Sequence, residues 1–124
     1  DNDYPNMQEG LELKKQSTQN KKQQRIASAR QKIAAIEKAL KKNISPDERA
    51  ELLLQKAETL SNCGFGRLKT CRERADIDNE LQYLSAANRD FEAADFYARE
   101  EAHQENVANN IFKHLHISKK GRDI

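Results

Sequence analysis

The sequence has little of what interrupts a helix and little of what builds a large core. Only four of its 124 residues are Gly and two are Pro, and it has no Trp, three Tyr and four Phe. Alternating apolar and polar runs, which would predict strands, are missing, while runs of Ala, Leu, Glu, Lys, Gln and Arg favour helix. Because 36% of the residues are apolar and 34% are charged, we expect one all-α domain with a modest core and loosely held parts.

Long apolar runs are missing as well. No stretch approaches the ~20 apolar residues that a transmembrane helix needs, so the sequence predicts no membrane span. The first residues, beginning Asp1-Asn2, lack the basic, apolar and small-residue regions of a secretory signal peptide. We therefore expect either that the chain never carried such a peptide or that it was removed, and the compartment stays open.

Cysteine is scarce: Cys63 and Cys71 are the two in the chain, with Gly64 and Gly66 between them. An even number of cysteines in a short chain is compatible with one disulfide in an oxidising compartment, although two thiols also occur in cytosolic proteins. A chain reversal at Gly64 to Gly66 would bring the pair together, so we predict that they can bridge; a bridge would favour a secreted or periplasmic location. No further Cys or His pair completes a zinc site.

The net charge of +2 hides an uneven distribution. Residues 11–45 carry ten basic and two acidic side chains, whereas residues 46–115 carry nine basic and fourteen acidic ones. A basic first segment thus precedes an acidic body, and we expect the two either to pack together or to recruit different partners.

The first 42 residues divide into three parts. Residues 1–10 contain Pro5 and Gly10 and predict a flexible lead-in. Residues 11–25 favour helix but positions 14 to 25 hold no apolar residue, so this polar basic arm is expected to project into solvent or to await a partner. Residues 26–42 carry an apolar stripe in steps of three and four, typical of a helix–helix seam: Ile26, Ala29, Ile33, Ile36 and Leu40. It predicts docking on the rest of the domain, with a homodimer through Ile26, Ile33, Ile36 and Leu40 as the alternative.

Turn and cap residues define three further helices. Ser45, Pro46 and Glu48 form a capping box with Pro at the first helical position, which predicts a helix over 46–62. We expect Gly64 to end it in a left-handed conformation, with Phe65 folding back on the apolar face. A third helix should cover 66–88, with a kink or break at 76–79, and a fourth 90–115, with Asn88 as left-handed ending and Asp90 as cap. The single helical domain then spans 11–116, and 117–124 form a flexible basic tail.

The expected inward faces follow from helical spacing. They comprise Ala50, Leu53, Leu54, Ala57 and Leu60 in the second helix; Leu68, Cys71, Ala75, Ile77, Leu81 and Leu84 in the third; and Phe91, Ala94, Tyr97, Ala98, Ala102, Val107, Ala108, Ile111, Phe112 and Leu115 in the fourth. Because the last set covers more than one stripe, we expect the fourth helix to contact two neighbours. The architecture predicted is a long N-terminal helix packed on a three-helix antiparallel body, either bundle-like or an irregular array of αα-hairpins.

Residues 81–98 (LQYLSAANRDFEAADFYA) resemble the helix-turn-helix of a tetratricopeptide repeat, with Leu81, Phe91 and Ala94 at the family's spacing. The resemblance implies an αα-hairpin. Gln82 stands where the family has a small residue and Ser85 where it has an aromatic one. No second copy follows at the ~34-residue period, so we interpret the segment as a generic αα-hairpin.

No motif predicts catalysis, a cofactor or a metal. Glu100 and His103 form one Glu-x-x-His step, but di-iron bundles need two such motifs and two further Glu. His114 and His116 point to different sides of a helix. Nothing around Cys71 resembles a nucleophile signature, and Gly64 to Gly66 lack the features of a P-loop. The sequence therefore favours a protein that is not an enzyme.

The function that remains is non-catalytic binding of another protein, as an adaptor, a chaperone-like factor or a secretion-associated factor. Two candidate surfaces carry it: the basic residues Lys14, Lys15, Lys21, Lys22 and Arg25, and the acidic residues Asp90, Glu92, Asp95, Glu100, Glu101 and Glu105. The alternative is nucleic-acid binding through the basic arm, although residues 11–45 hold no aromatic side chain to stack on bases. A metal or redox protein is a third hypothesis.

Overall fold

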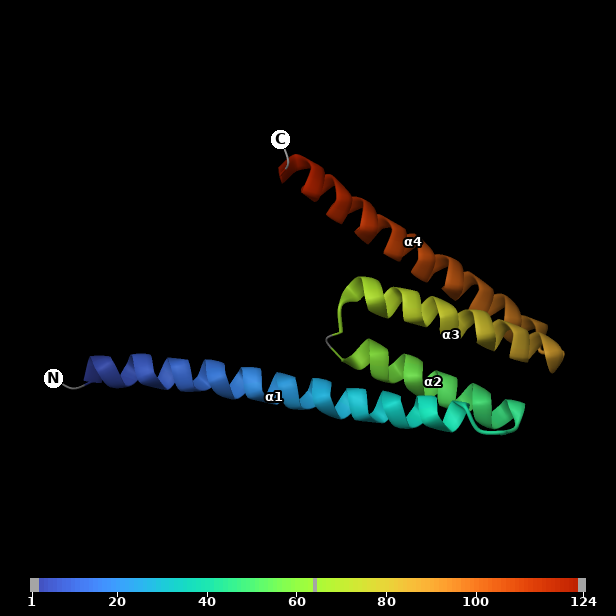
Figure 1. Cartoon of the computed structure of the whole chain (residues 1–124), viewed down its shortest axis with the longest axis horizontal. Helices are drawn as coiled ribbons and strands as arrows, with labels where there is room; N and C mark the ends of the chain where they lie inside the picture. The colour runs from blue at the N-terminus through green and yellow to red at the C-terminus, as the bar shows by residue number, and fades with distance from the viewer. Residues whose placement is uncertain (1–2, 64, 123–124) are drawn as a thin grey trace.

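The chain folds into helices joined by short connections (Figure 1). The computed structural model describes the backbone of residues 3–63 and 65–122, and the side chains of residues 9–63 and 65–115. Over these ranges it contains four helices and no strand: α1 (Asp3–Leu40), α2 (Pro46–Asn62), α3 (Arg67–Ala87) and α4 (Phe91–Arg122). The all-α prediction is confirmed.

Each helix packs on the next one in the sequence. In the part of the chain that the structure describes, α1 packs on α2, α2 on α3 and α3 on α4, and no other pair of helices is adjacent along the backbone. The arrangement is therefore an irregular array of αα-hairpins, open at both ends, and the α3–α4 hairpin is its most extensive pair. None of the helices in the described residues is apolar over enough of its length to cross a membrane.

The core lies where α2 and α3 face each other. Leu53 and Leu60 of α2 and Ile77 and Leu81 of α3 are buried together. Partly buried side chains of all four helices and of the α2–α3 connection pack against them: Ile33, Leu40, Ala50, Ala57, Phe65, Leu84 and Tyr97. Phe65 thus folds back onto the apolar face as predicted.

The apolar stripe of α1 packs within the chain. Ile36 is buried, Ile33 and Leu40 pack against the core, and Ile26 and Ala29 are half-buried. The structure therefore confirms the prediction that this stripe docks on the rest of the domain. A homodimer through the same stripe would have to bury a face that already packs within the chain. The stripe residues of that alternative are Ile26, Ile33, Ile36 and Leu40.

The predicted start of α2 is confirmed. Ser45 has an extended backbone, and its hydroxyl accepts a hydrogen bond from the Glu48 amide at 3.2 Å, with Pro46 as the first helical residue. Arg49, which follows, links three helices: its Nε donates to Glu80 of α3, and its Nη1 donates to the Leu40 carbonyl at the end of α1, at 2.9 Å. The last carbonyls of a helix have no hydrogen-bond partner within it, and Arg49 supplies one to the end of α1. The same side chain joins α2 to α3 through its bond to Glu80.

We expect Arg49→Met, which keeps the aliphatic stem, to lower the free energy of unfolding by about 1–2 kcal/mol, because charged hydrogen bonds to Leu40 and Glu80 are lost. The measurement is urea unfolding followed by circular dichroism. Arg99→Met is the control, since Arg99 pairs with Asp95 at 2.5 Å on the surface and such pairs contribute below about 0.5 kcal/mol. Equal losses for both variants would show that Arg49 does not link the helices.

The turn between α3 and α4 differs from prediction in one residue. Arg89, not Asn88, takes the left-handed conformation, with φ 60°, while Asn88 has φ −86° and ψ 6°. The Asp90 amide donates to the Ser85 carbonyl at 2.9 Å and the Arg89 amide to the Ala86 carbonyl at 3.0 Å, the two bonds of a Schellman ending. Asp90 caps α4 as predicted, accepting from the Ala93 amide at 3.2 Å.

Arg89→Gly should stabilise the fold by about 0.5–1 kcal/mol, because a left-handed non-Gly residue is strained by more than the entropy that Gly adds to the unfolded chain. Differential scanning calorimetry measures this as a higher melting temperature. Asn88→Gly is the matched control: its backbone is already right-handed, so this change should destabilise. A gain for Asn88→Gly without one for Arg89→Gly would contradict the assignment.

Several helix limits differ from those that the sequence predicts. Helix α1 begins at Asp3, so the predicted lead-in of residues 1–10 is helical from there; Pro5 fits because first-turn amides need no partner within the helix. Helix α4 continues to Arg122, through most of the predicted tail. The predicted break at 76–79 is wrong, since α3 is continuous. The left-handed ending assigned to Gly64 lies outside the described residues.

The apolar face of α4 is narrower than predicted. The backbone of α4 packs on α3 alone, the Tyr97 side chain packs against the core cluster of α2 and α3, and Phe91, Phe112 and Leu115 are exposed. In the described residues the backbone of α4 therefore has one neighbouring helix instead of the two predicted, while side chains of α2 and α4 line a common groove. Leu54 of α2 is likewise exposed. The reason is the open array: without a helix on the outer side, only one stripe of each outer helix can be buried.

The predicted disulfide is also wrong. Cys63 and Cys71 are free thiols. Cys63 follows the end of α2 with an extended backbone, and its sulfur lies 3.9 Å from the Arg25 carbonyl oxygen of α1, whereas Cys71 is buried on α3. The inference of a secreted or periplasmic location, which depended on the bridge, has no support from the fold.

Candidate functional site

The N-terminal half of α1 extends beyond the rest of the array (Figure 1). Every side chain from residue 9 to residue 25 is exposed, and half-burial starts at Ile26. Helix α2 ends opposite this point, because Cys63 contacts the Arg25 carbonyl. We call residues 9–25 the arm; its helix has no tertiary neighbour among the described residues.

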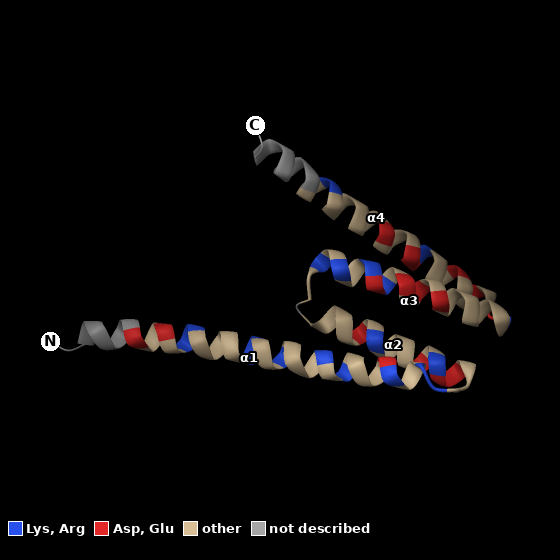
Figure 2. Ribbon diagram, in the orientation of Figure 1, with Lys and Arg blue, Asp and Glu red and all other residues tan. Residues whose placement is uncertain are grey.

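The charge of the arm has one sign over most of its length. All five basic residues named from the sequence lie there in exposed positions: Lys14, Lys15, Lys21, Lys22 and Arg25. No acidic residue occurs from Leu13 to Ile36, and none of the five cations is ion-paired with another described residue. In Figure 2, the part of α1 that reaches away from the body has two red bands near its N-terminus and then only blue and tan ones, whereas the body has mixed charge.

The acidic residues named on α4 lie in different settings. Asp90 caps the helix, Asp95 pairs with Arg99, and Glu92 and Glu105 are exposed. Glu100 and Glu101 are half-buried, and an oxygen of Glu100 lies 3.9 Å from Nη2 of Arg74 on α3. The six therefore do not share the continuous exposure that the five cations of the arm have.

A charged cluster joins α3 to α4, with Asp78 buried and its three neighbours half-buried: Arg74, Glu100 and Glu101. Asp78 is buried, and its Oδ2 and the Oε2 of Glu100 have no hydrogen-bond partner among the described residues. Burial, then repulsion from Glu100, raises the pKa of Asp78 from 3.8 to about 6, although Arg74 opposes the rise. Burial and the neighbouring Glu105 also raise the pKa of Glu101. Because the Asp78 carboxyl is buried between the two helices of the hairpin, its charge affects stability.

One groove brings together the Cys and His residues considered for chemistry. Cys63, Cys71 and His103 line it together with Thr70 and Arg74, between α2, α3 and α4. Among the described residues, no three His, Cys, Asp or Glu side chains gather as a metal site requires. Glu100 faces Arg74 and His103 is exposed, so the Glu-x-x-His step does not form a joint site; His114 is exposed as well, and the side chain of His116 lies outside the described residues.

Sequence reasoning missed three polar residues that the fold uses: Arg49, Asp78 and Gln104. Asp78 and Gln104 are both buried in the α3–α4 pair. A signal for Asp78 was present, because it follows Cys71 and Ala75 at the helical steps of four and three that define their common face. Helical spacing alone does not predict its burial, because an aspartate is normally assigned to the surface.

Comparisons with known proteins identify no related family, protein or structure. No protein-family model matches the chain, and searches of curated proteins and of solved structures gave no significant match. The functional argument therefore depends on the geometry and charge of the chain itself.

Proposed function

We propose that this protein is a non-catalytic, helical protein-interaction module, of the adaptor, chaperone-like or secretion-associated kind, and that the arm of α1 is its binding element. The observation that carries the proposal is the arm itself: a helix exposed at every residue from 9 to 25. Most helices in proteins are stabilised by packing an apolar or amphipathic face. A helix that reaches into solvent on an otherwise packed array is suited to gain that packing from a partner.

Nucleic-acid binding through the arm is the second candidate, and the uninterrupted positive charge from Leu13 to Ile36 favours it. Phosphate contacts would give binding that weakens steeply with salt. The arm offers no aromatic side chain for base stacking, so such binding would be insensitive to sequence.

The two candidates can be separated with the full chain. Photo-crosslinking from residue 19 of the arm, followed by mass spectrometry, should identify one recurrent protein, and the same label at residue 43, in the exposed α1–α2 connection, is the control. Titration of a random-sequence DNA duplex at increasing salt should show weak binding only. Sub-micromolar duplex binding at physiological salt would favour the nucleic-acid candidate and contradict the proposal. The logarithm of the binding constant should then fall with the logarithm of the salt concentration with a slope of about −4.5, as about five phosphate contacts imply.

A further inference from the structure

One face of α1 continues without a break from the packed half into the arm. The packed half presents Ile26, Ala29, Ile33, Ile36 and Leu40 to the body. Continuing toward the N-terminus in steps of three and four, the same face carries Lys22, Thr18, Lys15 and Leu11. The mean step over the whole series is about 3.6 residues, the period of a straight α-helix. We call Leu11, Lys15, Thr18 and Lys22 the outer face.

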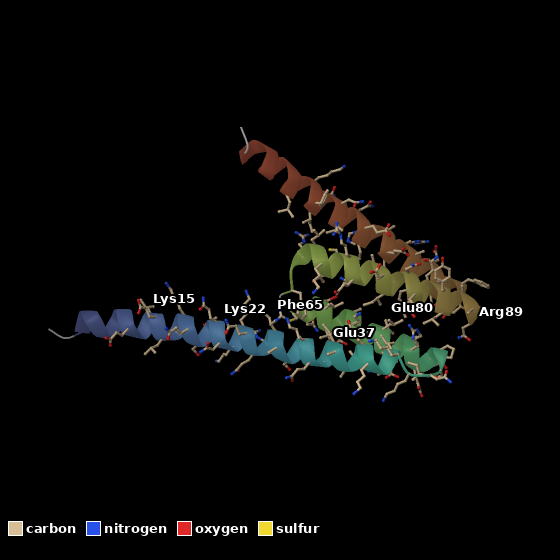
Figure 3. All side chains as sticks on the ribbon, in the orientation of Figure 1. Lys15, Lys22, Glu37, Phe65, Glu80 and Arg89 are labelled. Carbon is tan, nitrogen blue, oxygen red and sulfur yellow. The ribbon has the colours of Figure 1, made fainter. Side chains whose placement is uncertain are left out.

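The outer face lies on the side of α1 that packs on α2 farther along. Figure 3 shows Lys15 and Lys22 projecting from that side, beyond the end of α2. Helix α2 stops at Asn62, and a groove lined by Arg25, Asn62 and Cys63 marks the junction. The seam between α1 and α2 therefore ends because α2 ends, while the matching face of α1 goes on.

The chemistry of the face changes at this junction. Toward the core it is apolar, whereas the outer face has two lysines, one threonine and a leucine that is 58% exposed. The Thr18 hydroxyl donates to the Lys14 carbonyl at 2.9 Å, so its hydrogen is used within the helix and its methyl group is available for packing. Lys14, Lys21 and Arg25 lie along one edge of the outer face by helical spacing.

From these observations we infer that the outer face binds an acidic amphipathic helix of another protein, placed end to end with α2 along α1. The inference rests on the proposed function and names the chemistry of the partner. Residues 11–25 span about 21 Å, which about 14 residues of a partner helix would match. Apolar side chains of that helix would cover Leu11 and Thr18, and its carboxylates would pair with the lysines.

A protein helix fits this face better than the other occupants. The face continues one that already packs a helix, and Leu11 is an apolar anchor that phosphates would not use. A second copy of this chain fits less well, because the acidic α4 side chains among the described residues form no continuous exposed face. Asp90 is a cap, Asp95 pairs with Arg99 and Glu100 faces Arg74, which leaves the exposed Glu92 and Glu105 thirteen residues apart. Positive charge along the edge would select acidic over basic helices.

The probe for the test is a fluorescent 21-residue helical peptide with Leu at the first and fourth heptad positions and Glu at the flanking positions; a matched peptide has Lys in place of each Glu. We expect the full chain to bind the acidic peptide at least tenfold more tightly than the basic one, measured by anisotropy. Lys15→Glu with Lys22→Glu should weaken binding by roughly tenfold to a hundredfold, because two attractions become repulsions. Leu11→Ser should weaken it several-fold.

Lys41→Glu with Lys42→Glu is the matched control: it reverses the same charge at exposed positions outside the outer face and should change binding less than twofold. Circular dichroism of each variant verifies that helix content is kept. Equal binding of the two peptides, or unchanged binding by the outer-face variant, would overturn the inference. So would competition by a random duplex at equal affinity, or a concentration-dependent dimer in sedimentation that Lys15→Glu with Lys22→Glu abolishes.

Failure of the inference and failure of the proposed function give different results. If crosslinking from residue 19 still captures one recurrent protein while the acidic peptide shows no preference, the module remains and the chemistry assigned to its partner is wrong. If crosslinking captures no more from residue 19 than from residue 43, the proposed function itself is contradicted.

Discussion

Truncation of Leu53 or Leu81 to Ala is expected to lower the free energy of unfolding by about 3–5 kcal/mol. The two side chains are 3% and 2% exposed and belong to one cluster that joins α2 to α3. Removing a buried isopropyl group loses its transfer free energy and leaves a cavity that the helices close only in part. Because a small domain is stable by about 5–15 kcal/mol, either variant should lose much of its cooperative urea transition.

Leu54→Ala is the matched control for this experiment. Leu54 follows Leu53 directly, is the same residue type in the same helix, and is 46% exposed, so its truncation should cost about 1 kcal/mol or less. Phe112→Ala, which the sequence would place with the core variants, should also have a small effect because Phe112 is 53% exposed. A loss for Leu54→Ala equal to that for Leu53→Ala would show that the buried face of α2 is wrongly assigned.

Asp78→Asn is expected to stabilise the protein at pH 8 by about 1–3 kcal/mol, the upper limit being the effect of a pKa raised by about two units. The Asp78 carboxyl has a folded pKa of about 6 and an ordinary value of 3.8. The folded state therefore binds this proton more tightly than the unfolded state does, and the wild type loses stability as pH rises from about 4 to about 6. Asparagine removes that loss because it carries no charge at either pH.

The test is chemical unfolding of both proteins at pH 4, 5, 6, 7 and 8. The difference between Asp78→Asn and wild type should grow between pH 4 and pH 6 and stay constant above it. Asp76→Asn is the control, an exposed aspartate of the same helix, and should change stability little at any pH. A constant difference across the range would mean that the carboxyl of Asp78 titrates normally, with a well-hydrated environment in place of the buried one.

Local sequence signals were reliable where one residue and its immediate neighbours decide the structure. Ser45, Pro46 and Glu48 located the start of α2, and Asp90 the cap of α4, because a cap is satisfied by groups within one turn. The stripe from Ile26 to Leu40 predicted a packed face because its period matches the helix. The exposure of most of the arm could be predicted for the converse reason: positions 14 to 25 hold no apolar residue and so offer nothing to bury.

What required the tertiary structure was the number of neighbours each helix has. The spacing of apolar residues alone predicts two apolar stripes on α4 and places Leu54 and Phe112 inward. In the open array, however, a helix packs on only one side of α4. The same limit applies to Asp78, since propensity disfavours Asp inside a helix whereas packing against α4 holds it buried in a continuous α3. Burial of a polar group depends on a partner helix that is distant in sequence.

The sequence by itself determined the helical class, the caps, the packed stripe of α1 and the charge of its arm, because these depend on contacts within about one turn or on composition. Only the tertiary structure decided that Cys63 points to α1 instead of Cys71, that Arg49 joins α1, α2 and α3, and that α2 ends opposite Arg25. These features depend on where one helix stops along another. That alignment is set by the packing of the whole core, which the sequence pattern of a single helix does not contain.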